Sequence, residues 1–182
     1  MKQFRKLLIL VLALTLCLTL FAGCGKKDDP TPAEDKTAVT DPAEKEMAKP
    51  AEVGGETVTY AGCSVLVPEG FVLKEPGDFS YYDFSVRKSD FSYFDFITTD
   101  DDDLIMSKYE YNKQTYTNEQ VDVEAVCGDL TWTGFQYSDG WGGYGFEVYT
   151  TLDGKLIRVA SAGFQFDSDV ARAVLGSVAK AG

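Results

Sequence analysis

Histidine, the residue most often used for general-base catalysis and zinc binding, is absent from the 182-residue sequence. Its absence excludes Ser-His and Cys-His catalysis and every histidine-ligated metal centre. The remaining residues with chemical potential are glycines, acids, cysteines and aromatic side chains at defined spacings. Each of these patterns has both a chemical and an ordinary structural interpretation.

The glycines Gly140, Gly142 and Gly145 satisfy G-x-G-x-x-G, the spacing of dinucleotide-binding loops. That chemistry requires a helix N-terminus next to the pyrophosphate. Here the glycines lead into FEVYTT, which predicts a strand. The pattern therefore indicates turn and close-packing glycines before a hairpin, and we expect no cofactor.

Ser85 and Lys88 form S-x-x-K, the acylating pair of penicillin-recognising enzymes. In those enzymes the serine opens a helix, and K-T-G and S-D-N motifs occur elsewhere in the chain. Ser85 lies in a predicted strand and neither motif occurs here, so the spacing is a chance match.

The consecutive aspartates Asp100–Asp103 could offer oxygen ligands to Ca²⁺. An EF-hand loop needs glycine at its sixth position, where Ile105 stands. The aspartates also precede a helical pattern, and acids in a first turn complement the helix dipole. We therefore expect a solvated helix N-terminus and no metal site.

Asp122 and Glu124 are two residues apart on a predicted strand, so they share one face. Paired carboxylates hydrolyse glycosides when held at a defined separation. The sequence gives no separation and no cleft, and a solvated strand face is the favoured interpretation.

Of the four cysteines in the sequence, Cys63 and Cys127 lie in the C-terminal segment 56–182. An exported protein could join them in a disulfide, which would stabilise the fold by about 4 kcal/mol in the chain-entropy model. Each could equally be a small buried residue. The sequence leaves both possibilities open.

Asp153-Gly154 is the strongest hairpin signal in the chain. A two-residue turn there places Tyr149 opposite Arg158, with Glu147 diagonal to the arginine. The three side chains could form an exposed recognition spot with cation-π and ion-pair contacts, or an ordinary surface pair worth under about 1 kcal/mol.

Trp141 lies in the glycine-rich loop DGWGGYG, where a ring is poorly placed to join a core. Trp132 lies on a predicted central strand and is expected in the core. Trp141 is therefore the aromatic residue that we expect to be exposed for binding.

The N-terminus has Lys2, Arg5 and Lys6 and then an apolar stretch from Leu7 to Ala22. This is the layout of an export signal. The stretch ends in LFAGC, residues 20–24, which resembles the lipobox of bacterial lipoprotein precursors. The resemblance implies a signal peptide over 1–23, diacylglyceryl on Cys24 and a membrane-anchored protein on the extracytoplasmic face. The alternative is an uncleaved anchor helix of about 25 Å, at the short end for a bilayer.

Residues 24–55 follow as the lipidated cysteine and its tether. The segment 25–55 holds four of the six prolines and no aromatic residue, which predicts a disordered chain with a reach of roughly 30 Å. Residues 56–182 hold both tryptophans and all ten tyrosines, and they predict one globular domain. The net charge of −12 excludes nucleic acid as a partner, and we expect a monomer.

The order of expected strands and helices predicts an α+β fold for the domain, with an antiparallel sheet of about seven or eight strands and two helices on one side. The order of elements, with VPEGF early and VLGSV late, is similar to the PsbP-like fold of small extracytoplasmic accessory proteins. That resemblance implies a fold and an accessory role, and it assigns no catalytic residue. The expected strands are 57–67, 71–74, 80–87, 91–98, 120–127, 130–138, 144–152 and 155–164, and the expected helices are 100–112 and 168–176.

These patterns favour a non-enzymatic binding or accessory module that is anchored to the membrane through lipid. Its partner would be an unknown envelope protein or glycan, contacted through Trp141 and the Tyr149–Arg158 hairpin face. The alternative is a small carboxylate-dependent hydrolase of cell-envelope polymers. A cleft that contains a carboxyl group of raised pKa would favour the enzyme.

Overall fold

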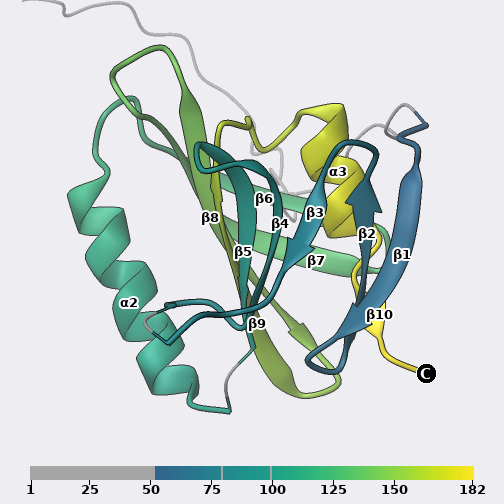
Figure 1. Cartoon of the computed structure of the whole chain (residues 1–182). Coiled ribbons are helices and arrows are strands. Elements are labelled where there is room, and N and C mark those ends of the chain that lie inside the picture. The colour runs from purple at the N-terminus through teal and green to yellow at the C-terminus, as the bar shows by residue number, and fades with distance from the viewer. Residues whose placement is uncertain (1–51, 79, 99) are drawn as a thin grey trace, which may run out of the picture. The chain divides into compact units, whose positions relative to one another are not determined.

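Residues 52–78, 80–98 and 100–182 are described by the structure, which is a computed structural model. They form the expected α+β fold, with antiparallel pairing throughout the described ladders (Figure 1). The predicted signal peptide, Cys24 and nearly all of the predicted tether lie outside the described residues. The first strand begins at Gly55, the last residue of the predicted tether. No described helix is long and apolar enough to cross a membrane.

The larger sheet has seven strands, and a smaller sheet has three. In spatial order the larger sheet comprises β3 (Val72–Lys74), β4 (Phe84–Ser89), β5 (Ser92–Ile97), β9 (Lys155–Ala162), β8 (Tyr144–Leu152), β7 (Leu130–Ser138) and β6 (Val121–Cys127). The smaller sheet comprises β1 (Gly55–Tyr60), β2 (Cys63–Pro68) and β10 (Ala179–Lys180). The helices are α2 (Asp102–Thr115) and α3 (Asp169–Gly176).

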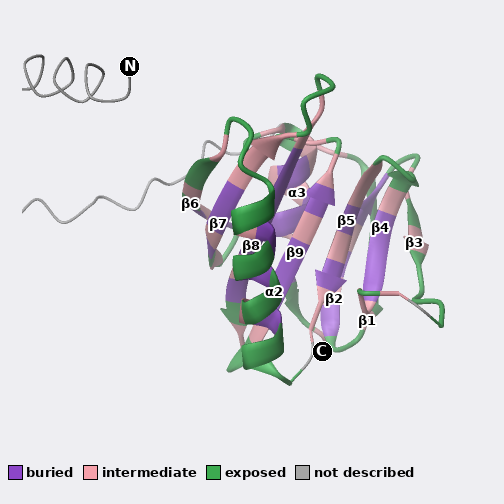
Figure 2. Cartoon of the chain, turned by 90° about the vertical axis from the view of Figure 1, so that its left-hand side faces the viewer, coloured by how far each residue is buried: buried purple, intermediate pink, exposed green. Residues whose placement is uncertain are grey.

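The two helices cover opposite faces of the larger sheet, which corrects the expectation that they share one side (Figures 1 and 2). Strand β8 shows the reason. Its Phe146 and Val148 join the main core with α3, whereas Tyr149 contacts Tyr109 of α2, with ring centroids 5.2 Å apart. Because successive side chains of a strand point to opposite faces, β8 needs a cover on both sides.

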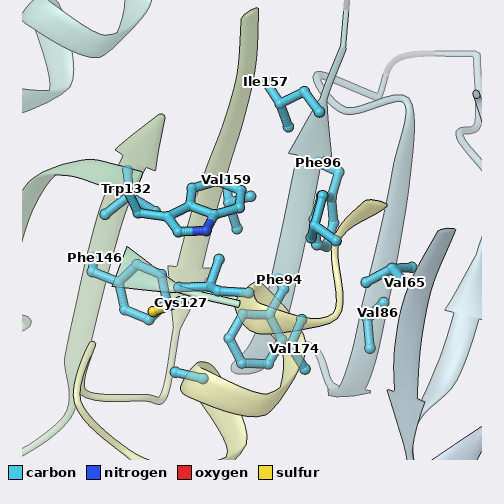
Figure 3. Close-up of a cluster of buried hydrophobic side chains, with 14 of the residues drawn as sticks. Val65, Val86, Phe94, Phe96, Cys127, Trp132, Phe146, Ile157, Val159 and Val174 are labelled. Carbon is cyan, nitrogen blue, oxygen red and sulfur yellow. The ribbon is translucent and has the colours of Figure 1, made fainter. Parts of the chain in front are cut away.

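The main core lies between the larger sheet, α3 and the small sheet (Figure 3). Its largest fully buried side chains are aromatic, with Phe84 and Phe96 stacked at a centroid distance of 4.5 Å. Valines of β2 and the apolar face of α3 close it from the other side. Truncation of one such phenylalanine to alanine would cost about 3–5 kcal/mol.

Two-residue turns fix the register of the hairpins. Asp153 and Gly154 have φ of 55° and 79°, and they bring Tyr149 opposite Arg158 as expected. Ala61 and Gly62, with φ of 51° and 82°, make a second such turn. This turn divides the single strand predicted over 57–67 into β1 and β2.

Side-chain caps begin both helices. Asp101 accepts a hydrogen bond from the Leu104 N–H at 2.9 Å, so one member of the aspartate run is the N-cap of α2. Asp100 pairs instead with Lys155, at 2.6 Å. Ser168 caps α3, because its side chain accepts a hydrogen bond from the Ala171 N–H. The aspartates therefore serve helix capping and a surface ion pair, and no group of three possible metal ligands occurs among the described residues.

Candidate functional site

The loop between β7 and β8 is folded around the carboxylate of Asp139. Asp139 Oδ1 accepts hydrogen bonds from the backbone N–H groups of Trp141, at 2.7 Å, and Gly143, at 2.9 Å. The Asp139 N–H in turn donates to the Gly143 carbonyl at 3.0 Å. These bonds close the loop on itself, so its conformation is set before any partner arrives.

The glycines of the loop have steric roles. Gly140 and Gly142 have φ of 78° and 90°, a backbone region that favours glycine. A Cβ on Gly145 would lie 2.6 Å from the ring of Tyr137. Because strand β8 follows directly, the dinucleotide spacing reflects turn and packing requirements, as predicted.

Trp141 is the most exposed large apolar side chain of the described residues, with 94% of its surface accessible. Trp132 is fully buried in the core, which confirms the contrast expected between the two tryptophans. The loop is also tied to the α2–β6 connection, because the Ser138 N–H donates to the Asn118 carbonyl at 2.9 Å. The Trp141 ring is therefore carried by a loop that is hydrogen-bonded to the neighbouring α2–β6 connection.

A second exposed aromatic residue, Phe91, lies at the same end of the sheet, and sequence reasoning missed it. Phe91 is 84% exposed in the β4–β5 turn. Gly163 links the two turns: its N–H donates to the Tyr144 carbonyl at 2.8 Å, and its hypothetical Cβ would lie 2.5 Å from the Phe91 carbonyl. The sequence offered one signal for Phe91, its position at the start of the strand predicted over 91–98, directly after the short connection 88–90.

Arg158 and Glu147 form the expected ion pair, with Tyr149 opposite Arg158 in the strand register, but the group is not the exposed spot that was considered. Arg158 Nε and Nη2 each lie 2.9 Å from Glu147 Oε2, and Arg158 and Glu147 are only 5% and 2% exposed. Helix α2 covers the cluster, and its Asn112 donates to Glu147 Oε1 at 2.5 Å. The expectation of exposure was wrong because the sequence did not show that α2 packs over this face.

Two carboxyl groups on the α2 face have raised pKa values. Desolvation by burial is the main cause for both Asp95 and Glu147, and arginines oppose the rise. Asp95 accepts hydrogen bonds from Ser85 at 2.5 Å and from Arg87 at 3.0 Å. Each acid is thus engaged by an arginine and a neutral donor, which is the arrangement of a structural ion pair.

Asp122 and Glu124 are exposed on β6, as the favoured interpretation expected. Asp122 Oδ1 lies 2.7 Å from Lys113 Nζ of α2. Both acids line a groove of about 340 Å³ between α2 and the β6–β7 edge, together with Tyr109 and Tyr149.

Cys63 and Cys127 are both buried in the structure and no disulfide joins them. The two residues have different surroundings. Cys63 lines a hollow of about 200 Å³ with Leu152 and Ile157. Cys127 precedes Gly128, which is packed against Gly176 of α3. Burial raises the pKa of both thiols, to about 11 for Cys127.

Comparison with known proteins finds similarity to solved structures. No protein-family model and no curated protein matches the chain. The solution structure of the cyanobacterial PsbP protein from Synechocystis matches 72% of this chain and 98% of its own, with 14% identity and a TM-score of 0.46. It belongs to the family that the order of elements resembled. We take no functional conclusion from so weak a likeness.

Proposed function

We propose that this protein is a lipid-anchored, extracytoplasmic binding or accessory module without catalytic activity, and that the β7–β8 loop is its contact element. The observation that carries the proposal is the loop built around Asp139, which exposes Trp141 almost completely. The hydrogen bonds to Asp139 restrict the loop, and the positive φ of Gly140 and Gly142 allows its turns, while the ring stays accessible. Rigid aromatic anchors of this kind dominate many binding interfaces.

The location rests on the N-terminal sequence. The apolar stretch that ends in LFAGC supports lipid attachment at Cys24 and a site of action outside the cytoplasm. Two or more acyl chains hold a protein stably at a membrane. The net charge of −12 supports neutral or cationic partners over nucleic acid.

The hydrolase alternative receives less support. Raised pKa values occur at Asp95 and Glu147, but the carboxylate oxygens of these residues already face Arg87 and Arg158. A proton donor for glycoside cleavage must reach the substrate oxygen. Glu147 lies beneath α2, where a polymer has no access to it.

A capture experiment tests the proposal. The full-length lipoprotein, its W141A variant and a Y81A control are solubilised in mild detergent, immobilised and exposed to membrane vesicles, envelope proteins and peptidoglycan fragments. Tyr81 is 90% exposed at the opposite end of the sheet, so its loss controls for a nonspecific aromatic effect. We expect W141A to lose capture and Y81A to retain it. Equal capture by all three proteins, or consumption of a polymer by the parent, would contradict the proposal.

A further inference from the structure

We infer that the partner of the Trp141 loop is the membrane itself, and that Trp141 and Phe91 together insert into the interface of a neutral bilayer. The inference rests on the proposed lipid anchor and deepens the proposed function by naming what the contact element meets. Three observations carry it: two exposed aromatic tips at one end of the domain, the start of strand β1 at that end, and the chemistry and charge of the tips and their surroundings.

The first observation is that both aromatic tips project from the same end of the larger sheet. Ser138 pairs with Tyr144 at the base of the Trp141 loop, and Gly145 pairs with Ala162 next to it. Ala162 also pairs with Tyr93, so the β4–β5 turn that carries Phe91 belongs to the same end. Figures 1 and 2 show the two turns projecting in a common direction.

The second observation is that β1 begins at this end. Gly55 pairs with Pro68, and the Glu69 N–H donates to the Gly54 carbonyl at 2.9 Å. The turn that follows Pro68 carries Phe71, whose ring packs 5.9 Å from that of Phe164, one residue after Gly163. The chain from Cys24 therefore enters the domain at the same end as the aromatic tips (Figure 1), and the shortest span of tether brings this end to the membrane.

The third observation is the chemistry of the two tips. Tryptophan is enriched where membranes meet water, because its ring is apolar and its indole N–H still finds a polar partner. A phenylalanine beside it adds apolar area that the acyl region accepts. Two separate tips with 94% and 84% exposure suit shallow insertion into a deformable lipid surface.

The charged residues around Trp141 and Phe91 indicate which kind of lipid headgroup this end of the domain would meet. The exposed acids Asp90, Glu119 and Asp139 flank the turns. The basic residues close to Phe91 in sequence are Lys88 and Arg87, and Arg87 is paired with Asp95. Recognition of anionic headgroups requires clustered lysine and arginine, which this end lacks among its described residues. A zwitterionic phosphatidylcholine surface is therefore the appropriate probe.

The two tryptophans provide a direct experiment, because Trp132 is fully buried and Trp141 is not. Full-length lipoprotein is reconstituted into phosphatidylcholine vesicles whose acyl chains carry bromine, a contact quencher of indole fluorescence. We expect the parent to lose the Trp141 part of its emission. The W141F variant, which retains only Trp132, should lose none.

Two further variants in the W141F background test which end of the domain meets the lipid. F91W/W141F places a tryptophan at the second tip and should be quenched. Y81W/W141F is the matched control, because Tyr81 is as exposed but lies in the β3–β4 connection at the far end, near Lys108 of α2. It should not be quenched.

The same samples are floated on a density gradient to separate the two proposals. A chain that floats with the vesicles but shows no quenching of Trp141 keeps its anchor and overturns the insertion. Equal quenching of F91W/W141F and Y81W/W141F overturns the assigned end. A chain that does not float overturns the anchor and the insertion together. If W141A still loses capture of a soluble envelope protein while Trp141 is unquenched, the contact element stands and its partner is a protein.

Discussion

Asn112 of α2 and Glu147 of β8 are joined by a buried hydrogen bond of 2.5 Å, although they lie 35 residues apart in sequence. The bond attaches the helix to the sheet at the point where Arg158 already neutralises the carboxylate. A polar triad therefore lies under α2, in a layer otherwise filled by rings such as Tyr109 and Phe135. It specifies how α2 sits on the sheet.

The first prediction concerns the energy of this triad. R158M should lower the free energy of unfolding by about 3–5 kcal/mol, because it leaves the Glu147 carboxylate buried without a counter-charge. The double variant E147L/R158M should recover much of that loss, because no charge remains to be desolvated. Urea unfolding followed by circular dichroism measures both. A double variant that is less stable than R158M would contradict the argument.

The second prediction concerns pH. Burial raises the pKa of Asp95 above its ordinary value, so the folded state holds this proton more tightly than the unfolded state. The contribution of protonated Asp95 to the free energy of unfolding is then fully present below about pH 4, and it is lost as the pH rises through the raised pKa of Asp95. The stability advantage of the parent over D95N should therefore change with pH between acid and neutral conditions. Parallel urea titrations over that range measure it, and a constant difference would refute the shift.

The third prediction concerns the Trp141 loop. D139A removes the acceptor for the Trp141 and Gly143 N–H groups, so these amides should lose protection from hydrogen exchange while the strands keep theirs. The fluorescence anisotropy of Trp141 should fall. Because the loop is exposed, global stability should change by less than about 1 kcal/mol. D129N, an exposed aspartate in the β6–β7 turn, is the control.

The fourth prediction concerns the thiols. Protein unfolded without reductant should show two titratable thiols from Cys63 and Cys127, because no disulfide joins them in the structure. In the folded protein at pH 8 both should react slowly, because burial raises their pKa values and keeps the thiolate scarce. Cys63 should react first, because it lines a hollow. If the unfolded, unreduced protein showed no titratable thiol from Cys63 or Cys127, the two residues would form a disulfide.

The fifth prediction concerns the anchor. Mass spectrometry of the mature protein should place its N-terminus at a lipid-modified Cys24, and C24S should leave the membrane fraction. Each buried methylene contributes about 0.8 kcal/mol to membrane binding, so loss of the acyl chains should release the domain. A C24S protein with the mass and membrane fraction of the parent would show that the apolar stretch acts as an uncleaved anchor.

Local patterns allowed most of the fold to be predicted from the sequence. The strands 130–138 and 144–152 agree with β7 and β8 at both ends, and the Asp153-Gly154 turn set the β8–β9 register correctly. Turn chemistry and alternation depend on neighbouring residues, which a sequence displays directly. The Ala61-Gly62 turn was missed because alanine rarely adopts a positive φ.

Tertiary packing determined what the sequence could not show. Arg158 and Glu147 were expected at the surface because the sequence of the β8–β9 hairpin does not show that α2 packs over it. The approach of Gly128 to Gly176, where a Cβ would come within 2.2 Å of the Gly176 carbonyl, likewise joins β6–β7 to α3 over a long sequence separation. The exposure of Trp141 could be predicted because it follows from the residues of its own loop. The place of Phe91 at the same end of the sheet depends on the strand order, which the sequence did not show.

Strand β6 ends the larger sheet, and among the described residues it pairs only with β7. Its free edge carries the exposed acids Asp122 and Glu124. If a second molecule added its own β6 to this edge, four carboxylates would be brought close together, and like charges on paired strands are destabilising. Anchored proteins reach high local density in the plane of a membrane, and this acidic border would keep neighbouring copies from fusing their sheets into aggregates.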